Sequence, residues 1–153
     1  MSKVKIVLLG VLGIFLALQF FRGDLPEVNE VTQDDIMGQL QVDKEMSNLI
    51  VSACYDCHSN QTEYPWYSYV APVSWLIIKD TNEGREELNF SKWGTMAKRR
   101  KIRKLKEIGE EVEEKEMPMT VFTITHPEAR LTDEQRDQIV RWTKSMTQKL
   151  LKE

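Results

Sequence analysis

The feature that most constrains this chain is the run Cys54-Tyr55-Asp56-Cys57-His58, which contains both of its cysteines and one of its two histidines. Two thiols at i and i+3 lie on one face of a helix, and this spacing with a following histidine is the pattern of c-type haem attachment. In such sites each cysteine forms a thioether with one haem vinyl group, and the histidine ligates the iron. The run therefore predicts a covalently attached haem c, held by Cys54, Cys57 and His58.

Other uses of a cysteine pair fit this sequence less well. A thioredoxin-like dithiol follows a strand, whereas the residues before Cys54 have helical periodicity. A structural zinc ion needs about four ligands, and the only other cysteine or histidine is His126. One adjacent pair is not the framework of a disulfide-stapled scaffold. The remaining alternative is an incidental pair of thiols without a cofactor.

The iron of such a haem is either open on its second face or closed by a further ligand. Met117 is the first candidate, because Pro118 restrains its loop between two predicted helices, and Met/His ligation raises the reduction potential. Met119 competes if the loop turns differently, and His126 would give bis-histidine ligation with a lower potential. An open or water-bound iron is the fourth alternative.

The N-terminus predicts a membrane anchor. Lys3 and Lys5 precede an apolar run over residues 6–21, which ends in Phe20-Phe21-Arg22. As a helix the run covers roughly 24 Å, somewhat less than a hydrocarbon core of about 30 Å. Bulky aromatic residues make a poor signal-peptide cleavage site, so an uncleaved signal anchor is favoured over a cleaved signal peptide. The lysines place the N-terminus in the cytoplasm, with residues 24–153 on the periplasmic or extracytoplasmic side.

The rest of the sequence predicts an all-α domain. The expected organisation is an anchor over residues 1–22, a polar tether over 23–39 and one mono-haem domain over 40–153. About four helices and no convincing strand favour a small cytochrome c-like fold. The predicted helices cover residues 42–58, residues 72 to about 84, residues 91–112 with Ser91 as N-cap, and a final helix opened by the capping box Thr132-Asp133-Glu134-Gln135.

The charge distribution limits the partners. All 24 acidic residues lie in residues 24–153, together with only 18 of the 21 basic ones. A negative body argues against a nucleic-acid partner, which would require a basic surface. The basic block at residues 98–106 is interpreted as a solvated helix face, with anionic lipid or an acidic redox partner as alternatives. The expected partners are the membrane, through the N-terminal anchor, and a redox protein.

Several segments together resemble the bacterial haem-binding domain family, whose members are small exported or membrane-tethered c-type cytochrome-like proteins. The resemblance covers about residues 40–145 and rests on Cys54-Tyr55-Asp56-Cys57-His58-Ser59-Asn60, Tyr64-Pro65-Trp66-Tyr67, Ala71-Pro72-Val73-Ser74-Trp75, Glu83-Gly84-Arg85, Leu88-Asn89-Phe90-Ser91-Lys92-Trp93 and Glu116-Met117-Pro118. It implies one haem on Cys54 and Cys57 with iron on His58, and it supports Met117 as the distal candidate.

These patterns predict a membrane-tethered mono-haem protein that transfers electrons outside the cytoplasmic membrane. The alternatives are a peroxidase-like haem enzyme, with His126 as its acid–base group, and a haem-based redox or gas sensor in which a ligand displaces Met117. Trp66, Trp75 and Trp93 are expected to wall the haem or fill the core. Arg85 is expected to be a surface residue, with pairing to a haem propionate as the alternative.

Overall fold

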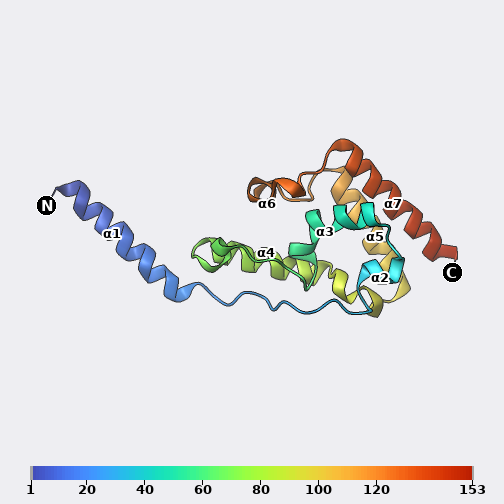
Figure 1. Cartoon of the computed structure of the whole chain (residues 1–153), viewed down its shortest axis with the longest axis horizontal. Coiled ribbons are helices and arrows are strands. Elements are labelled where there is room, and N and C mark those ends of the chain that lie inside the picture. Colours follow the sequence, from blue (N-terminus) through green and yellow to red (C-terminus); the bar gives the residue numbers. More distant parts are fainter. Residues whose placement is uncertain (1, 153) are drawn as a thin grey trace.

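The computed structural model describes residues 2–152, and these residues form helices without any strand, which confirms the all-α prediction. An apolar helix leads away from a helical body that holds all the other elements (Figure 1). The elements in chain order are α1 (Lys3–Leu18), η1 (Gln19–Phe21), α2 (Ile36–Leu40), α3 (Lys44–His58), η2 (Trp66–Tyr69), α4 (Val73–Glu87), η3 (Phe90–Thr95), α5 (Lys98–Glu113), α6 (Thr120–Thr125), η4 (Pro127–Ala129) and α7 (Asp133–Lys152), where η denotes a 3₁₀ helix.

The N-terminal helix is longer than the apolar run alone suggests. Ser2 caps α1 through its side chain, and the 3₁₀ turn η1 continues the helix to Phe21. The combined stretch Lys3–Phe21 is long and apolar enough to cross a membrane, and none of it is buried against the rest of the chain. By these criteria it is either a membrane anchor or a signal sequence.

The segment predicted as a tether lies against the domain along part of its length. The Asn29 N–H donates to the Asn60 carbonyl at 2.8 Å, and the Tyr64 hydroxyl donates to the Pro26 carbonyl at 3.0 Å. At the end of the segment, Asp35 caps α2 and is buried, and its Oδ1 accepts a 2.7 Å hydrogen bond from the hydroxyl of Tyr55. The last residues of this segment therefore belong to the packing of the domain.

Three of the four predicted helices begin and end close to where the sequence places them. α3 ends at His58 with Ser59 as its C-cap, and the predicted capping box opens α7, with the side chains of Thr132 and Gln135 bonding reciprocally to backbone N–H groups. α4 begins directly after Pro72 and continues through Gly84 to Glu87.

The third predicted helix begins later than expected, and the prediction of Ser91 as its N-cap is wrong. Residues Phe90–Thr95 form η3, which is capped by the Asn89 side chain accepting from the Ser91 N–H at 3.0 Å. The backbone is extended at Met96, and α5 starts at Lys98. This separate turn carries the fully buried Trp93 into the core.

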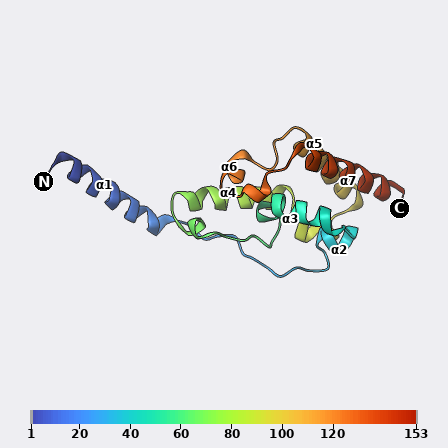
Figure 2. The same ribbon diagram turned by 45° about the horizontal axis from the view of Figure 1, so that its top comes forward.

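The core lies among α2, α3, η3, α5 and α7. α5 and α7 run side by side at the end of the domain away from α1, as both ribbon views show (Figures 1 and 2). The largest fully buried side chains include Trp93, Phe90, Ile36, Leu105 and Ile139. This packing fixes α5, and with it the loop after α5, relative to the end of α3 that carries the cysteine motif.

Candidate functional site

A cleft of about 700 Å³ lies beside the cysteine motif. This volume is within the range of small-molecule and cofactor sites, about 300–1,000 Å³. Its walls come from the end of α3, the second half of α4, the middle of α5 and the loop that leads into α6. The lining includes Cys54, Cys57 and His58 from α3, Gly84 and Leu88 at the end of α4, Lys104 and Ile108 from α5, and Met117, Met119 and Phe122 beyond it.

The two cysteines both line this cleft and are both free thiols. Burial raises the pKa of Cys57 to about 11, with a smaller contribution from the negative charge of Asp56. Burial likewise raises the pKa of Cys54 to about 12, with Cys57 as the second cause. Both sulfurs are therefore neutral thiols at neutral pH. Within residues 2–152, no group of three or more His, Cys, Asp and Glu side chains is arranged to hold a metal ion.

His58 is oriented by the end of α4. Its Nδ1 lies 2.9 Å from the Gly84 carbonyl oxygen and 3.2 Å from that of Leu88. Because carbonyl oxygens only accept, these contacts assign the proton to Nδ1 and leave the lone pair on Nε2. Burial lowers the pKa of His58, against the opposing effect of the two carbonyls. The residue is therefore a neutral imidazole with a free Nε2, which is the form that ligates a metal.

The close contact between α3 and α4 depends on a glycine. A Cβ atom built on Gly84 would lie 2.6 Å from the carbonyl oxygen of Cys57, so a larger residue would push the two helices apart. Arg85 secures the same junction by donating to the Ser59 carbonyl, to the Thr62 hydroxyl and to the Glu27 carbonyl, at 2.8 to 2.9 Å. Arg85 thus bonds to the protein's own backbone and does not line the cleft.

The loop carrying Met117 is fixed at its backbone. The Met117 N–H donates to the Glu111 carbonyl at 3.1 Å, and the Met117 carbonyl accepts from Arg136 of α7 at 2.7 Å. Arg136 also donates to the Val112 carbonyl at 3.0 Å, which ties the loop to the end of α5. Met117 and Met119 both line the same cleft as His58. The structure therefore brings both methionine candidates to the cysteine motif.

His126 occupies a different place. It lines a neighbouring apolar pocket of about 260 Å³ and not the cleft lined by His58. The ring of Phe122 stacks on it with centroids 4.2 Å apart, and its Nδ1 lies 3.2 Å from the Phe122 carbonyl oxygen. Its Nε2 is 3.5 Å from the hydroxyl of Tyr67.

Comparison with known protein families agrees with this geometry. The haem-binding domain family matches residues 13–145, which is most of the chain. The chain belongs to the haem-binding domain family. No curated protein and no solved structure shows a significant match to it.

The cleft of this haem-binding domain fits its cofactor. Haem needs an apolar space, a neutral nitrogen or sulfur ligand for iron, and, when attached covalently, two thiols on one face. The space beside His58 has all of these, with Ile108 and Phe122 among its apolar walls. Haem binding thus follows from the family and is consistent with the residues present.

One cleft residue of this haem-binding domain was missed by sequence reasoning. Lys104 belongs to the basic block read as a solvated face, yet its side chain is only 8% exposed. Its ammonium lies 2.6 Å from Glu107 and 3.5 Å from Glu87, which joins α5 to α4 across the cleft. The signal in the sequence is that Lys104 stands four residues before Ile108, on the face of α5 that lines the cleft.

The tryptophans divide differently from the prediction. Trp93 fills the core and is fully buried. Trp66 is 77% exposed and Trp75 is 41% exposed, and neither lines the cleft. The expectation that all of them wall the haem or fill the core is therefore wrong for these two.

Proposed function

We propose that this haem-binding domain is a mono-haem c-type cytochrome-like protein that transfers electrons at the outer face of the cytoplasmic membrane. One observation carries the proposal. A neutral His58, with Nδ1–H facing backbone carbonyls, lies in one cleft with two half-buried free thiols and with the methionine loop. The bound haem supplies one-electron oxidation and reduction at its iron.

The roles of the residues follow from their positions. Cys54 and Cys57 would hold the haem through thioethers, each formed by adding S–H across one vinyl group, which needs no oxidant. His58 would ligate the iron through Nε2, and its Nδ1 contacts would increase the electron density on the ring. Met117 is the proposed second ligand, because its backbone is held on both sides by hydrogen bonds.

The electron-carrier function is favoured over a peroxidase by the place of His126. A peroxidase requires an acid–base group at the open face of the iron. His126, the second histidine of the chain, is stacked by Phe122 in the neighbouring pocket. An electron carrier needs no such group and no substrate pocket.

Membrane attachment is proposed from α1 and η1. The 16 residues of α1 and the three of η1 give a helical length of about 30 Å, which matches the hydrocarbon core. We propose that residues 1–22 are an uncleaved anchor, with Lys3 and Lys5 on the cytoplasmic side, and that residues 40–153 hold the haem outside. An intact chain of 17.9 kDa plus one haem in the membrane fraction, measured by mass spectrometry, is the expected result. A shorter chain beginning after residue 21 would indicate a cleaved signal sequence.

The test of haem attachment and ligation uses the full chain produced together with a haem-attachment system. The expected result is haem that stays with the polypeptide on a denaturing gel, and its loss from a variant with both Cys54→Ser and Cys57→Ser. Retention of haem by that variant would refute covalent attachment.

The second ligand is tested by comparing Met117→Ala with Met119→Ala, since both methionines line the cleft. The oxidised parent protein should show the weak far-red band of methionine-to-iron ligation. Met117→Ala should lose this band, bind cyanide or carbon monoxide readily and have a lower potential, while Met119→Ala keeps the parent spectrum. The opposite pattern would assign Met119, and a high-spin parent protein that binds peroxide would favour the enzyme or the sensor.

A further inference from the structure

The anchor helix is joined to the domain by a set of direct hydrogen bonds. The Gln19 side chain donates to the Ala71 carbonyl at 3.1 Å and accepts from the Ala71 N–H at 3.0 Å. The Trp75 indole N–H donates to the Phe21 carbonyl at 2.7 Å, and the Ser74 hydroxyl donates to the Arg22 carbonyl at 2.9 Å. α1 therefore meets the domain at the start of α4 through a defined joint.

On the side of the domain, the surface at this joint is apolar and uncharged. Residues 64–78 contain no charged side chain, although 29% of the whole chain is charged. Aromatic side chains are exposed on both sides of the joint, from 41% for Trp75 to 88% for Phe20. We call this surface the aromatic collar; it consists of Phe20, Phe21, Trp66, Tyr69 and Trp75. Val73 and Leu76 are exposed beside it.

The aromatic collar lies at the height where the membrane surface is expected. A helical stretch of about 30 Å that starts at Lys3 crosses the hydrocarbon core by Phe21. The carbonyl of Phe21 is the one that accepts from Trp75, so the side chains of α4's first turn are at the same level. Trp and Tyr are enriched at this level in membrane proteins, because their rings are apolar and their N–H or O–H groups are polar.

We propose that the aromatic collar seats the domain on the outer leaflet, with Trp66, Tyr69 and Trp75 in the headgroup region of the bilayer. This inference rests on the proposed membrane anchoring. Continuity with α1 identifies lipid as the occupant, because any surface bonded to the end of a membrane-spanning helix lies against the bilayer. The family match also begins at residue 13, inside α1, and thus includes the joint.

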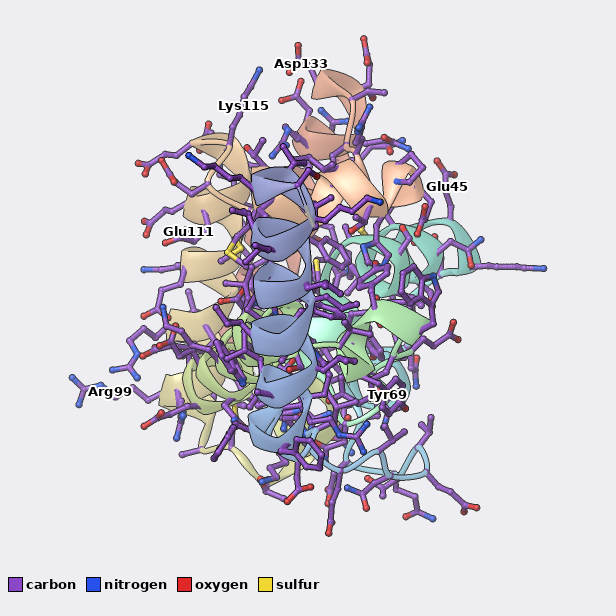
Figure 3. All side chains as sticks on the ribbon, turned by 90° about the vertical axis from the view of Figure 1, so that its left-hand side faces the viewer. Glu45, Tyr69, Arg99, Glu111, Lys115 and Asp133 are labelled. Carbon is purple, nitrogen blue, oxygen red and sulfur yellow. The ribbon has the colours of Figure 1, made fainter. Side chains whose placement is uncertain are left out.

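The basic block at residues 98–106 is not needed for this contact. It lies on α5, at the end of the domain away from α1 (Figure 1). Seen from the α1 side, Arg99 of this block points outward at the edge of the molecule (Figure 3). The proposed contact is therefore apolar and aromatic, and it should depend little on salt or on anionic lipid.

Contact of the aromatic collar with the outer leaflet would also set the position of the haem cleft relative to the bilayer. α4 rises from the joint, and its residues that line the cleft begin at Asp80, seven positions after Val73, and end with Glu87. At the rise of a helix these positions are about 10–20 Å from the collar. The cleft then stands at a set distance along α4 from the joint.

The test uses the full haem-loaded chain in nanodiscs of phosphatidylcholine and phosphatidylglycerol that contain a phosphatidylcholine with a photoreactive group near its headgroup. After illumination, mass spectrometry of proteolytic fragments locates the cross-linked residues. We expect cross-links on α1 and on residues 64–78, unchanged between low and high salt. Cross-links on α1 alone would refute the contact between the aromatic collar and lipid but not the membrane anchoring. An absence of cross-links on α1 would refute the anchoring. Salt-sensitive cross-links on α5 instead of residues 64–78 would assign the contact to the basic block.

A matched pair of variants tests the collar directly. A variant with Trp66→Ser and Tyr69→Ser removes aromatic rings that make no described hydrogen bond to the anchor. It should lower the yield of cross-links on residues 64–78, where Trp75 remains, while keeping those on α1. Leu151→Ser changes another exposed apolar side chain, on α7 at the end away from α1 (Figure 1), and should leave both sets unchanged. An unchanged yield of the 64–78 cross-links in the double variant would refute the proposed role of these rings.

Discussion

Replacing Gly84 with alanine tests the contact that orients His58. The added Cβ would lie 2.6 Å from the Cys57 carbonyl oxygen and 3.1 Å from its carbonyl carbon, and both are backbone atoms that cannot rotate away. α4 must therefore move away from α3 by several tenths of an ångström. The hydrogen bonds from His58 to Gly84 and Leu88, now 2.9 and 3.2 Å, lengthen with it.

One stabilising and two destabilising effects decide the size of the change. Alanine favours a helix over glycine by about 1 kcal/mol. Overpacking costs about 1–3 kcal/mol, and a weakened buried hydrogen bond adds about 1 kcal/mol. The free energy of unfolding should thus fall by about 1–3 kcal/mol, which lowers Tm by about 4–12 °C for a domain of this size.

The assay is thermal unfolding of the haem-loaded full chain in detergent micelles, followed by circular dichroism. Gly38→Ala in α2 is the matched control, because nothing lies within 4 Å of its Cβ and only the helix preference changes. Gly38→Ala should leave Tm equal or raise it. The reasoning is refuted if Gly84→Ala is as stable as Gly38→Ala. A second measurement is the reduction potential, which should rise in Gly84→Ala because a weaker Nδ1 contact makes the imidazole a poorer donor to ferric iron.

Two further predictions concern hydrogen bonds between residues that are distant in sequence. Arg136→Ala removes the donor to the Met117 carbonyl, so the loop loosens; cyanide should bind faster to the oxidised protein, and the free energy of unfolding should fall by about 1–3 kcal/mol in urea titrations. Tyr55→Phe removes the donor to buried Asp35 and should also cost about 1–3 kcal/mol, whereas Tyr67→Phe, whose hydroxyl makes only a 3.5 Å contact, should cost less than 1 kcal/mol. Burial raises the pKa of Tyr55 above its usual value, so the unfolded chain loses this proton first; stability should fall as pH rises above about 10, and less steeply in Tyr55→Phe.

The outcomes that contradict these predictions are specific. Arg141→Ala, an exposed position on the same helix, is the control for Arg136→Ala, and equal cyanide rates in the two variants would show that the loop holds without Arg136. Equal unfolding free energies for the Tyr55 and Tyr67 variants would show that the bond to Asp35 contributes nothing.

Local patterns predicted the parts of the fold that depend on neighbouring residues. The periodic run before the cysteine motif became α3, and the reciprocal bonds of Thr132 and Gln135 open α7 as expected. The start of α5 was mispredicted because Ala97, its N-cap, makes no side-chain bond that a sequence pattern can reveal. Burial of Trp93 decides the break before it, and that is a tertiary effect.

In the candidate site, too, local spacing predicts some features, and contacts between distant residues decide the others. Cys54, Cys57 and His58 share one cleft because their spacing alone puts them on one end of a helix. The arrival of Met117 at this cleft depends on Arg136, nineteen positions later, and the orientation of His58 depends on carbonyls at the end of α4. Trp75 is exposed where its indole bonds to the Phe21 carbonyl, a contact between distant residues that composition does not disclose.

α4 connects two parts of the molecule that have different surroundings. Through Ser74 and Trp75, its first turn bonds to the carbonyls of Arg22 and Phe21, just after α1. Its end bonds to His58 through the carbonyls of Gly84 and Leu88. A helix of 15 residues is a stiff strut of about 22 Å. In the proposed arrangement, a thicker or thinner bilayer would change the tilt of α1. Because α4 is bonded at both ends, this change would shift the carbonyls that contact His58. In that arrangement, bilayer thickness would influence the two carbonyl contacts that orient His58.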